Sequence, residues 1–180
     1  MKRIDWNNVK EVNDNYLTPG GYVCGITSVE DVPAKEYLKF EFDIVEGEFK
    51  NYYRALSESK GFWGGSFIKS YKEKALGFFK QMLTCFEKSN NGFVFVDDEK
   101  TFRGKYIGIV LSEEEYIKND NSVGKRLYVS DIKSIFDIKN GEFEVKPLKT
   151  IEGRQLPSTP TNNANSVDFD EISDDDLPWA

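Results

Sequence analysis

The hydrophobic period changes along this 180-residue chain, and that change restricts the fold more than any other feature. Residues 37–45, YLKFEFDIV, alternate between apolar and polar side chains, which is typical of a strand with one buried face. Across residues 71–86 apolar side chains recur at helical spacing, so we expect one amphipathic helix there. Ser70 and Glu73 have the spacing of a capping box at its start, and the NNG at residues 90–92 is a typical stop.

Segments with strand and turn patterns lie on both sides of this helix. Strands are expected over residues 22–32, 37–45 and 48–56 before it, and over 93–96, 102–111 and 125–132 after it. The glycine-rich residues 61–67 and the residues 113–116 and 119–121 are expected to be loops, and residues 134–145 close the domain. The fold class is therefore mainly β with one main helix. Five strands with a helix between the third and fourth is the element order of the OB-fold, a five-stranded Greek-key barrel; an open α+β sheet is the alternative.

The charge is unevenly distributed and divides the chain into three parts. Residues 1–154 form the predicted folded domain and carry 24 basic and 25 acidic residues. Residues 155–166 are mostly small and polar and cannot bury enough apolar surface to become ordered, so we expect a flexible linker. Residues 167–180 form a disordered acidic tip, and the linker and tip together hold most of the net charge of −7. A nearly neutral domain remains compatible with a polyanionic ligand.

The composition excludes several classes of protein. The chain has no histidine, which removes the commonest general base, the usual serine and cysteine hydrolase sites and most zinc sites. No apolar run is long enough to cross a membrane, and the first residues lack the apolar core of a signal peptide. Cys24 and Cys85 suit a reducing compartment, where we expect them to be ordinary buried thiols. No metal or other cofactor is expected.

Aromatic rings and cations lie close together at several places, as the binding of a single nucleic-acid strand requires. Cations follow the phosphates, and flat rings stack on the bases at roughly 1–3 kcal/mol per base. If Leu127 and Val129 face the core, Arg126 and Tyr128 share the other face of their strand. Trp63 is favoured because it lies in a glycine-rich loop. The candidate DNA-binding residues are Tyr52, Tyr53, Arg54, Trp63, Arg103, Lys105, Tyr106, Lys125, Arg126 and Tyr128.

The C-terminal tip joins a run of aspartates to a hydrophobic end. A solubilising tail needs the charge but not the apolar residues, so we interpret the tip as a short linear motif for a protein partner. The tail resembles that of bacterial and bacteriophage single-stranded DNA-binding proteins, whose tip typically reads Asp-Asp-Asp-Ile-Pro-Phe. The residues that match by type and in order, and that the resemblance implies bind partners, are Asp174, Asp175, Asp176, Leu177, Pro178 and Trp179. Ala180 departs from the pattern, because in the family the aromatic residue also supplies the terminal carboxylate.

The domain resembles phage-encoded single-stranded DNA-binding proteins of low-GC Gram-positive bacteria over residues 19–148. The stretches that carry the resemblance are GFWGGSFIKSYKEKALGFFKQMLTCFEKSNNGF, FRGKYIGIVLSEEEY and GKRLYVSDIKSI. The resemblance implies an OB-fold and sequence-tolerant binding of single strands, but it identifies no individual binding residue. We therefore expect a non-enzymatic protein that coats and protects single-stranded DNA during phage replication or recombination, in the cytoplasm of the bacterial host. Its tip would recruit replication or recombination proteins; a homo-oligomer remains open, and no membrane contact is expected.

Two other functions remain open. Asp43, Glu48 and Lys50 are the residue types of a Mg²⁺-dependent nuclease, although a chain with 31% charged residues produces such triplets by chance. An adaptor that binds only proteins is the second alternative, and the neutral domain favours it. For the DNA-binding function, the acidic tail has a further expected role: it would compete with DNA for the groove and be released when DNA binds.

Overall fold

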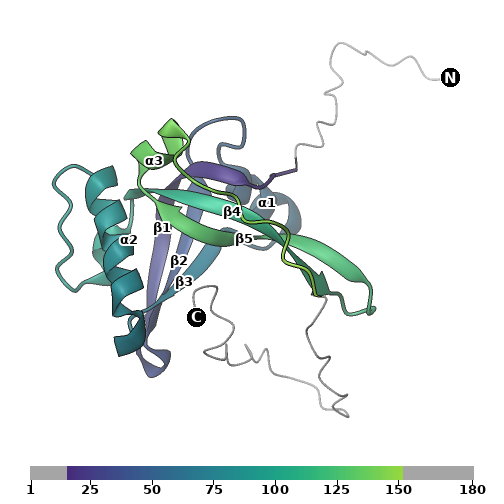
Figure 1. The fold of residues 1–180 in the computed structure, drawn as a ribbon, viewed down its shortest axis with the longest axis horizontal. Helices are drawn as coiled ribbons and strands as arrows, with labels where there is room; N and C mark the ends of the chain where they lie inside the picture. The colour runs from purple at the N-terminus through teal and green to yellow at the C-terminus, as the bar shows by residue number, and fades with distance from the viewer. Residues whose placement is uncertain (1–15, 152–180) are drawn as a thin grey trace.

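The computed structural model describes residues 16–151, which form one five-stranded antiparallel sheet with three α-helices around it (Figure 1). The strands are β1 (Gly20–Val32), β2 (Tyr37–Ile44), β3 (Ser66–Ser70), β4 (Tyr106–Ile117) and β5 (Val123–Lys133). The α-helices are α1 (Tyr52–Lys60), α2 (Leu76–Ser89) and α3 (Ile135–Asn140), and the 3-10 helices are η2 (Pro33–Lys35), η3 (Glu73–Ala75) and η4 (Glu99–Phe102). The expectation of a mainly β domain with one main helix, α2, is confirmed.

The long strand β1 is the centre of the sheet. Its first half, residues 20–25, pairs with β4, and residues 24–32 pair with β2. The register shifts between Ile26 and Ser28, and an extra residue of this kind bends a strand and increases its twist. Because β1 pairs with β2 along one edge and with β4 along the other, the strand order is β3-β2-β1-β4-β5.

The sheet is open at its two edge strands. β3 pairs only with β2, and β5 pairs only with β4, within the described residues. A groove of about 200 Å³ lies between these edges, and charged side chains from both strands, Lys69 and Asp131, are among its lining residues. The closed Greek-key barrel expected from the sequence is therefore not confirmed.

The third strand was predicted in the wrong place. Residues 48–56 form a turn and the start of α1, because the buried carboxylate of Asp43 accepts hydrogen bonds from the N–H groups of Tyr53 and Arg54 at 3.0 and 3.3 Å. These bonds satisfy amides that a helix start leaves unpaired. β3 forms instead at the end of the predicted glycine-rich loop. There Gly65 is required, because a Cβ atom would collide with the Phe42 carbonyl oxygen and the Tyr53 ring.

The start of the main helix also differs from the prediction. Ser70 forms no capping box with Glu73; its hydroxyl accepts the Lys72 N–H and donates to the Glu36 carbonyl. The chain makes the 3-10 helix η3 first, and α2 begins at Leu76. Ser70 therefore ties β3 to the β1–β2 connection rather than starting a helix.

Three later predictions need correction. Residues 93–96 are not a strand; Phe93 and Phe95 pack their rings on Phe102. The strand predicted over 102–111 begins only at Tyr106, because residues 99–102 form η4, and it continues through the predicted loop 113–116. Residues 134–145 contain α3, which a capping box between Ser134 and Asp137 initiates.

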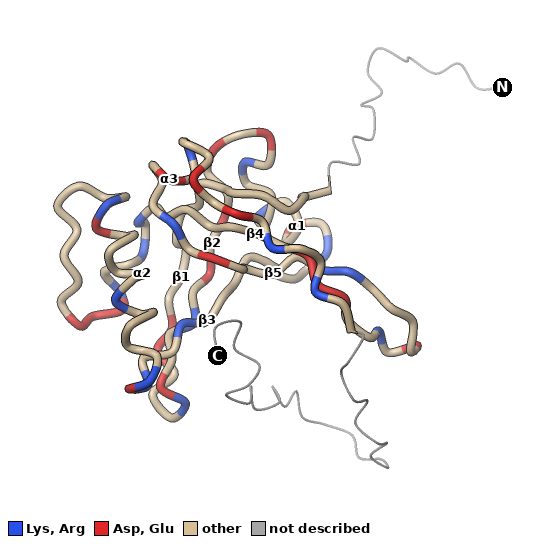
Figure 2. Tube along the Cα trace, in the orientation of Figure 1, with Lys and Arg blue, Asp and Glu red and all other residues tan. Residues whose placement is uncertain are grey.

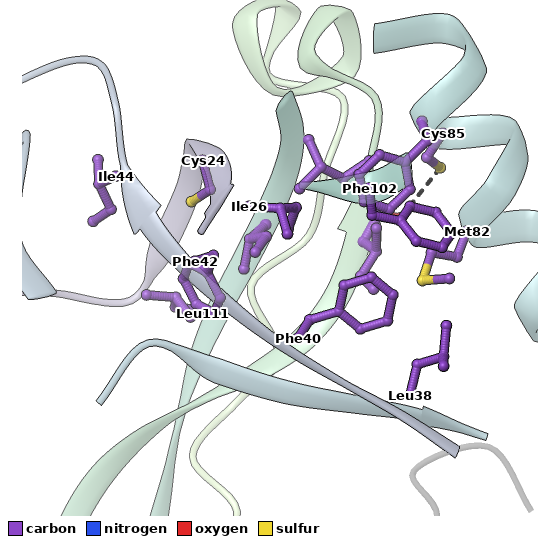
Figure 3. Packing of buried hydrophobic residues seen from close by; sticks show 14 of the residues in the cluster. Cys24, Ile26, Leu38, Phe40, Phe42, Ile44, Met82, Cys85, Phe102 and Leu111 are labelled. Atoms are coloured by element: carbon purple, nitrogen blue, oxygen red, sulfur yellow. Dashed lines mark hydrogen bonds between the residues drawn. The ribbon is translucent and has the colours of Figure 1, made fainter. Parts of the chain in front are cut away.

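The main core lies between the inner face of the sheet and α2 (Figure 3). Phe40 is fully buried, stacks on Phe67 with ring centroids 4.8 Å apart, and meets Phe102 edge to face at 5.2 Å. From α2, Met82 and Phe86 close the same cluster. The alternation of residues 37–45 is confirmed, since all four apolar residues of that strand's inner face are buried.

A smaller cluster lies on the opposite face of the sheet under α3. Ile138 packs there with Val23 and Val110. Gly108 of β4 leaves no room for a side chain, because a Cβ atom would meet Ile138 and the Ser134 carbonyl. This helix therefore covers the first halves of β1 and β4 and does not reach the far end of β4 (Figure 1).

Candidate nucleic-acid interface

The β4–β5 hairpin projects beyond the rest of the sheet and forms an arm (Figure 1). The pairing of β4 with β1 ends at Leu111, whereas its pairing with β5 continues to Ile117 and Val123. Beyond β1, the free side of β4 is covered by the C-terminal segment: Glu115 donates its N–H to the Lys149 carbonyl, and Lys149 donates to the Glu113 carbonyl. We call residues 112–128 the arm.

One face of the arm combines rings with a cation. Directly paired residues share a face of an antiparallel ladder, and the pairs are Ser112 with Tyr128, Glu114 with Arg126, and Tyr116 with Gly124. Arg126 and Tyr128 therefore share the face opposite Leu127 and Val129, which pack against the core, as the sequence predicted. We call the face formed by these three pairs the outer face of the arm; its ring-bearing and cationic residues are Tyr116, Arg126 and Tyr128.

Arg126 is held in place on this face. Its Nε donates to Oε1 of Glu114 at 2.7 Å, and its guanidinium carbon lies 5.4 Å from the centroid of the Tyr116 ring. The Arg126 side chain is 62% exposed, whereas that of Glu114 is only 13% exposed. Partial burial, and then the charge of Glu114, raise the pKa of Tyr128. The guanidinium is thus accessible to an anion, and its present partner is a carboxylate.

The arm as a whole is nearly balanced in charge. Lys125 lies on the other face, paired with Glu115, so a basic and an acidic residue face each other on both sides of the ladder. Figure 2 shows basic and acidic residues next to one another along the arm. A ligand here would be held by local contacts with rings and Arg126 rather than by a broad positive field.

The structure does not bring the other predicted binding residues to the arm. Tyr52, Tyr53 and Arg54 lie on α1 rather than on a strand. Tyr53 is only 6% exposed and packs edge to face on Phe42, and burial raises the pKa of its phenol. It therefore belongs to the core. Tyr52 is half-buried against the same cluster, and only Arg54 is exposed.

Contacts within the protein also account for the position of Trp63. Its ring packs against the main core, and Nε1 donates to the Gly65 carbonyl at 3.0 Å. The neighbouring Phe62, which the sequence did not single out as a binding residue, is the exposed ring of this loop at 57%.

Arg103, Lys105 and Tyr106 form a separate group at the opposite end of β4. Tyr106 is 49% exposed, and Lys105 lies over the Phe93 ring. Tyr106 and Tyr116 lie on one continuous strand, so the rise of about 3.3 Å per residue places them roughly 33 Å apart. Of the ten candidates, the structure thus places Lys125, Arg126 and Tyr128 together on the arm, and Arg103, Lys105 and Tyr106 far from them.

The sequence analysis did not identify Tyr116 and Glu114 as site residues, because residues 113–116, which precede a polar turn, were interpreted as a loop. The available signal was the turn at residues 118–122: an alternating strand follows it, so a matching strand is expected before it. It also missed the outer face of β2 and β3, where Tyr37 pairs with Ser70 and Lys39 pairs with Ile68.

The residues of the nuclease hypothesis do not assemble around an open space. Asp43 is 4% exposed, and its carboxylate accepts three backbone N–H groups, those of Tyr53, Arg54 and Ile44. Among residues 16–151 no group of three acidic or sulfur side chains is placed to hold a metal ion. Asp43 therefore has a structural role at the start of α1.

The linker and the tip lie outside the described residues, and so do Asp174, Asp175, Asp176, Leu177, Pro178 and Trp179. The last described residue, Ile151, donates its N–H to Oε2 of Glu115 on the arm at 3.3 Å. The described part of the chain thus ends at the arm, next to Glu115, on the face opposite Glu114 and Arg126. Over residues 16–151, no helix has the length and apolar character needed to cross a membrane.

The sequence matches no protein-family model, and a search of curated proteins found no relative.

Proposed function

We propose that this chain is a sequence-tolerant single-stranded DNA-binding protein built on an OB-fold whose barrel is partly open. Three features support the fold: the strand order, the division of β1 between β2 and β4, and the position of the main helix between β3 and β4. The OB-fold is a partly open five-stranded barrel, and it binds oligonucleotides with its β2–β3 face and its β1–β2 and β4–β5 connections.

The observation that carries the function is the outer face of the arm. Tyr116, Arg126 and Tyr128 lie together on a β4–β5 hairpin that extends past the core. Rings beside a cation are the two groups that bind a single strand, through base stacking and phosphate contact. The outer face of β2 and β3 adds a further ring, Tyr37, and a second cation, Lys39.

The proposed role follows from this chemistry and from the tail. The protein coats and protects exposed strands in phage DNA replication or recombination, in the cytoplasm of the host, and catalyses no reaction. The tip recruits replication or recombination proteins through residues 174–179. A segment of acidic and apolar residues is suited to such docking, with charge for steering and apolar groups to fill a pocket.

One observation favours the second candidate, an adaptor that binds only proteins. Arg126 is already paired with Glu114, and Lys125 faces Glu115, so the arm, with four acidic and three basic residues, presents no excess positive charge. Salt dependence separates the two functions, because phosphate contacts release counterions and their affinity falls steeply with salt.

The test is the fluorescence anisotropy of a labelled oligo-dT titrated with the full chain at several salt concentrations, with a duplex as control. Arg126→Ala is compared with Lys80→Ala, which also removes one positive charge but lies on the exposed side of α2. We expect Arg126→Ala to weaken binding and to lower the slope of log affinity against log salt by about 0.7, the value for one phosphate contact on a single strand. Lys80→Ala should leave both quantities near those of the wild type. If the wild type forms no complex at low salt, the adaptor is the better description.

A further inference from the structure

The guanidinium of Arg126 lies over the ring of Tyr116. Packing on the core does not explain why this ring lies on the surface of the arm. Tyr116 lies beyond the part of β4 that packs on the core, and its cross-strand partner is Gly124. A Cβ atom at position 124 would collide with the Tyr116 ring, so the glycine makes room for that ring to lie across the hairpin. The guanidinium of Arg126 then lies over the same ring.

Glu114 determines where the guanidinium lies. It is on the same face as Tyr116, directly opposite Arg126, and it holds Nε at 2.7 Å. A carboxylate and a phosphate use the same planar donors of arginine, so the two compete for one group. Glu114 holds Nε, so a phosphate that binds through Nε displaces Glu114, and Arg126 is then no longer held over the Tyr116 ring.

We propose that Tyr116 is a concealed base-stacking residue and that Glu114 is the latch that keeps it covered in the free protein. This inference rests on the proposed function and extends it, because it names a binding residue and its control at the same site. When Arg126 exchanges Glu114 for a phosphate, both contacts that a nucleotide needs become available. The phosphate gains the Arg126 guanidinium, and the base gains the uncovered ring.

The chain provides a matched control for the latch. Glu113 and Glu114 are neighbours on β4 and carry the same charge, but their side chains lie on opposite faces of the hairpin, and only Glu114 pairs with Arg126. Glu113→Gln therefore measures the general effect of one lost negative charge. Glu114→Gln measures that effect together with the release of Arg126.

The experiment is the anisotropy titration of labelled oligo-dT with full-length variants, each checked for an unchanged thermal unfolding midpoint. We expect Glu114→Gln to bind roughly two- to fivefold more tightly than Glu113→Gln at low salt, the range expected for releasing one ion pair at the protein surface whose arginine is exposed. We expect Tyr116→Leu to weaken binding by roughly 5- to 150-fold, the range for one lost base stack, and Tyr116→Phe to restore most of that loss.

The outcomes separate the inference from the function on which it rests. If oligo-dT binds but Glu114→Gln is no tighter than Glu113→Gln, there is no latch. If Tyr116→Leu binds as tightly as the wild type, Tyr116 stacks on no base, and the inference is overturned while DNA binding stands. If the wild type binds no oligo-dT, the proposed function and this inference both fail.

Discussion

At the scale of single residues, Asp137 shows how one side chain starts a helix that the hydrophobic pattern did not reveal. Its carboxylate accepts the Ser134 N–H at 3.1 Å, while the Ser134 hydroxyl accepts the Asp137 N–H at 3.2 Å. Hydrogen bonding with Ser134 lowers the pKa of this carboxyl below its usual value. The exchange sets the start of α3, whose Ile138 packs over β1 and β4.

The first prediction concerns the pH dependence of this cap. Because the folded-state pKa is lowered, the ionised Asp137 stabilises the fold above its unfolded-state pKa, and this contribution is lost as the pH falls through the folded-state value. Asp137→Asn should therefore reduce the free energy of unfolding near neutral pH by about 0.3–1 kcal/mol, the usual effect of a negative charge in the first turn of a helix. Urea unfolding at several pH values should show the difference from the wild type shrinking in acid. Asp97→Asn, at an exposed turn, is the control, and a difference independent of pH would contradict the argument.

At the scale of elements, the arm depends on the segment that returns along it after α3. Beyond Leu111 strand β4 no longer has β1 as a neighbour, and residues 146–149 take that place. The buried hydroxyl of Ser112 is the central contact: it donates to Ser130 Oγ at 2.8 Å and accepts the Lys146 N–H at 3.0 Å. The segment thus covers an edge that would otherwise be open to other chains.

Ser112→Ala tests this dependence. The substitution leaves the Lys146 N–H without its acceptor in a part-buried site, so we expect the free energy of unfolding to fall by about 1–3 kcal/mol. Ser66→Ala, at an exposed position of β3, should change it by less than about 0.5 kcal/mol. Denaturant unfolding followed by circular dichroism measures both. Equal effects of the two variants would show that the return segment contributes nothing to the arm.

At the scale of the whole molecule, the described part of the chain ends on the arm that carries the proposed DNA interface. Ile151 bonds to Glu115 on the arm, and 29 residues follow it, including the run of aspartates. A polyanionic segment joined to the arm at this point would be present at high effective concentration near the cationic groups that are proposed to bind phosphate. The position of Ile151 therefore supports the expectation that tail and DNA compete.

Removal of residues 167–180 should raise the affinity for single-stranded DNA. The physical reason is the loss of the competing charge, and screening by salt should make the gain largest at low ionic strength and small at high ionic strength. The measurement is the oligo-dT titration of the truncated and complete chains at matched salt. Equal affinity of the two chains at low salt would rule out the competition.

The sequence alone determined the features that depend on local pattern. The alternation of residues 37–45 predicted β2 and its buried face, and the helical spacing of residues 71–86 predicted the main helix, because both periods follow from the backbone geometry of a single element. It also identified Arg126 and Tyr128 as neighbours on one face, since side chains alternate along any strand. These inferences needed no knowledge of what lies across the sheet.

Only the tertiary structure decided the elements whose conformation depends on distant partners. Residues 52–60 are rich in strand-forming tyrosines at their start, yet they form α1, because Asp43 at the end of β2 bonds to their amides. Tyr53 was a candidate ligand contact, but it is a core residue because Phe42 and Gly65 lie against it. Residues 113–116, three glutamates and a tyrosine, form a strand because β5 and the C-terminal segment pair with both of its edges. Hydrogen bonds and burial supplied by other parts of the chain outweigh local propensity, and a local pattern does not contain them.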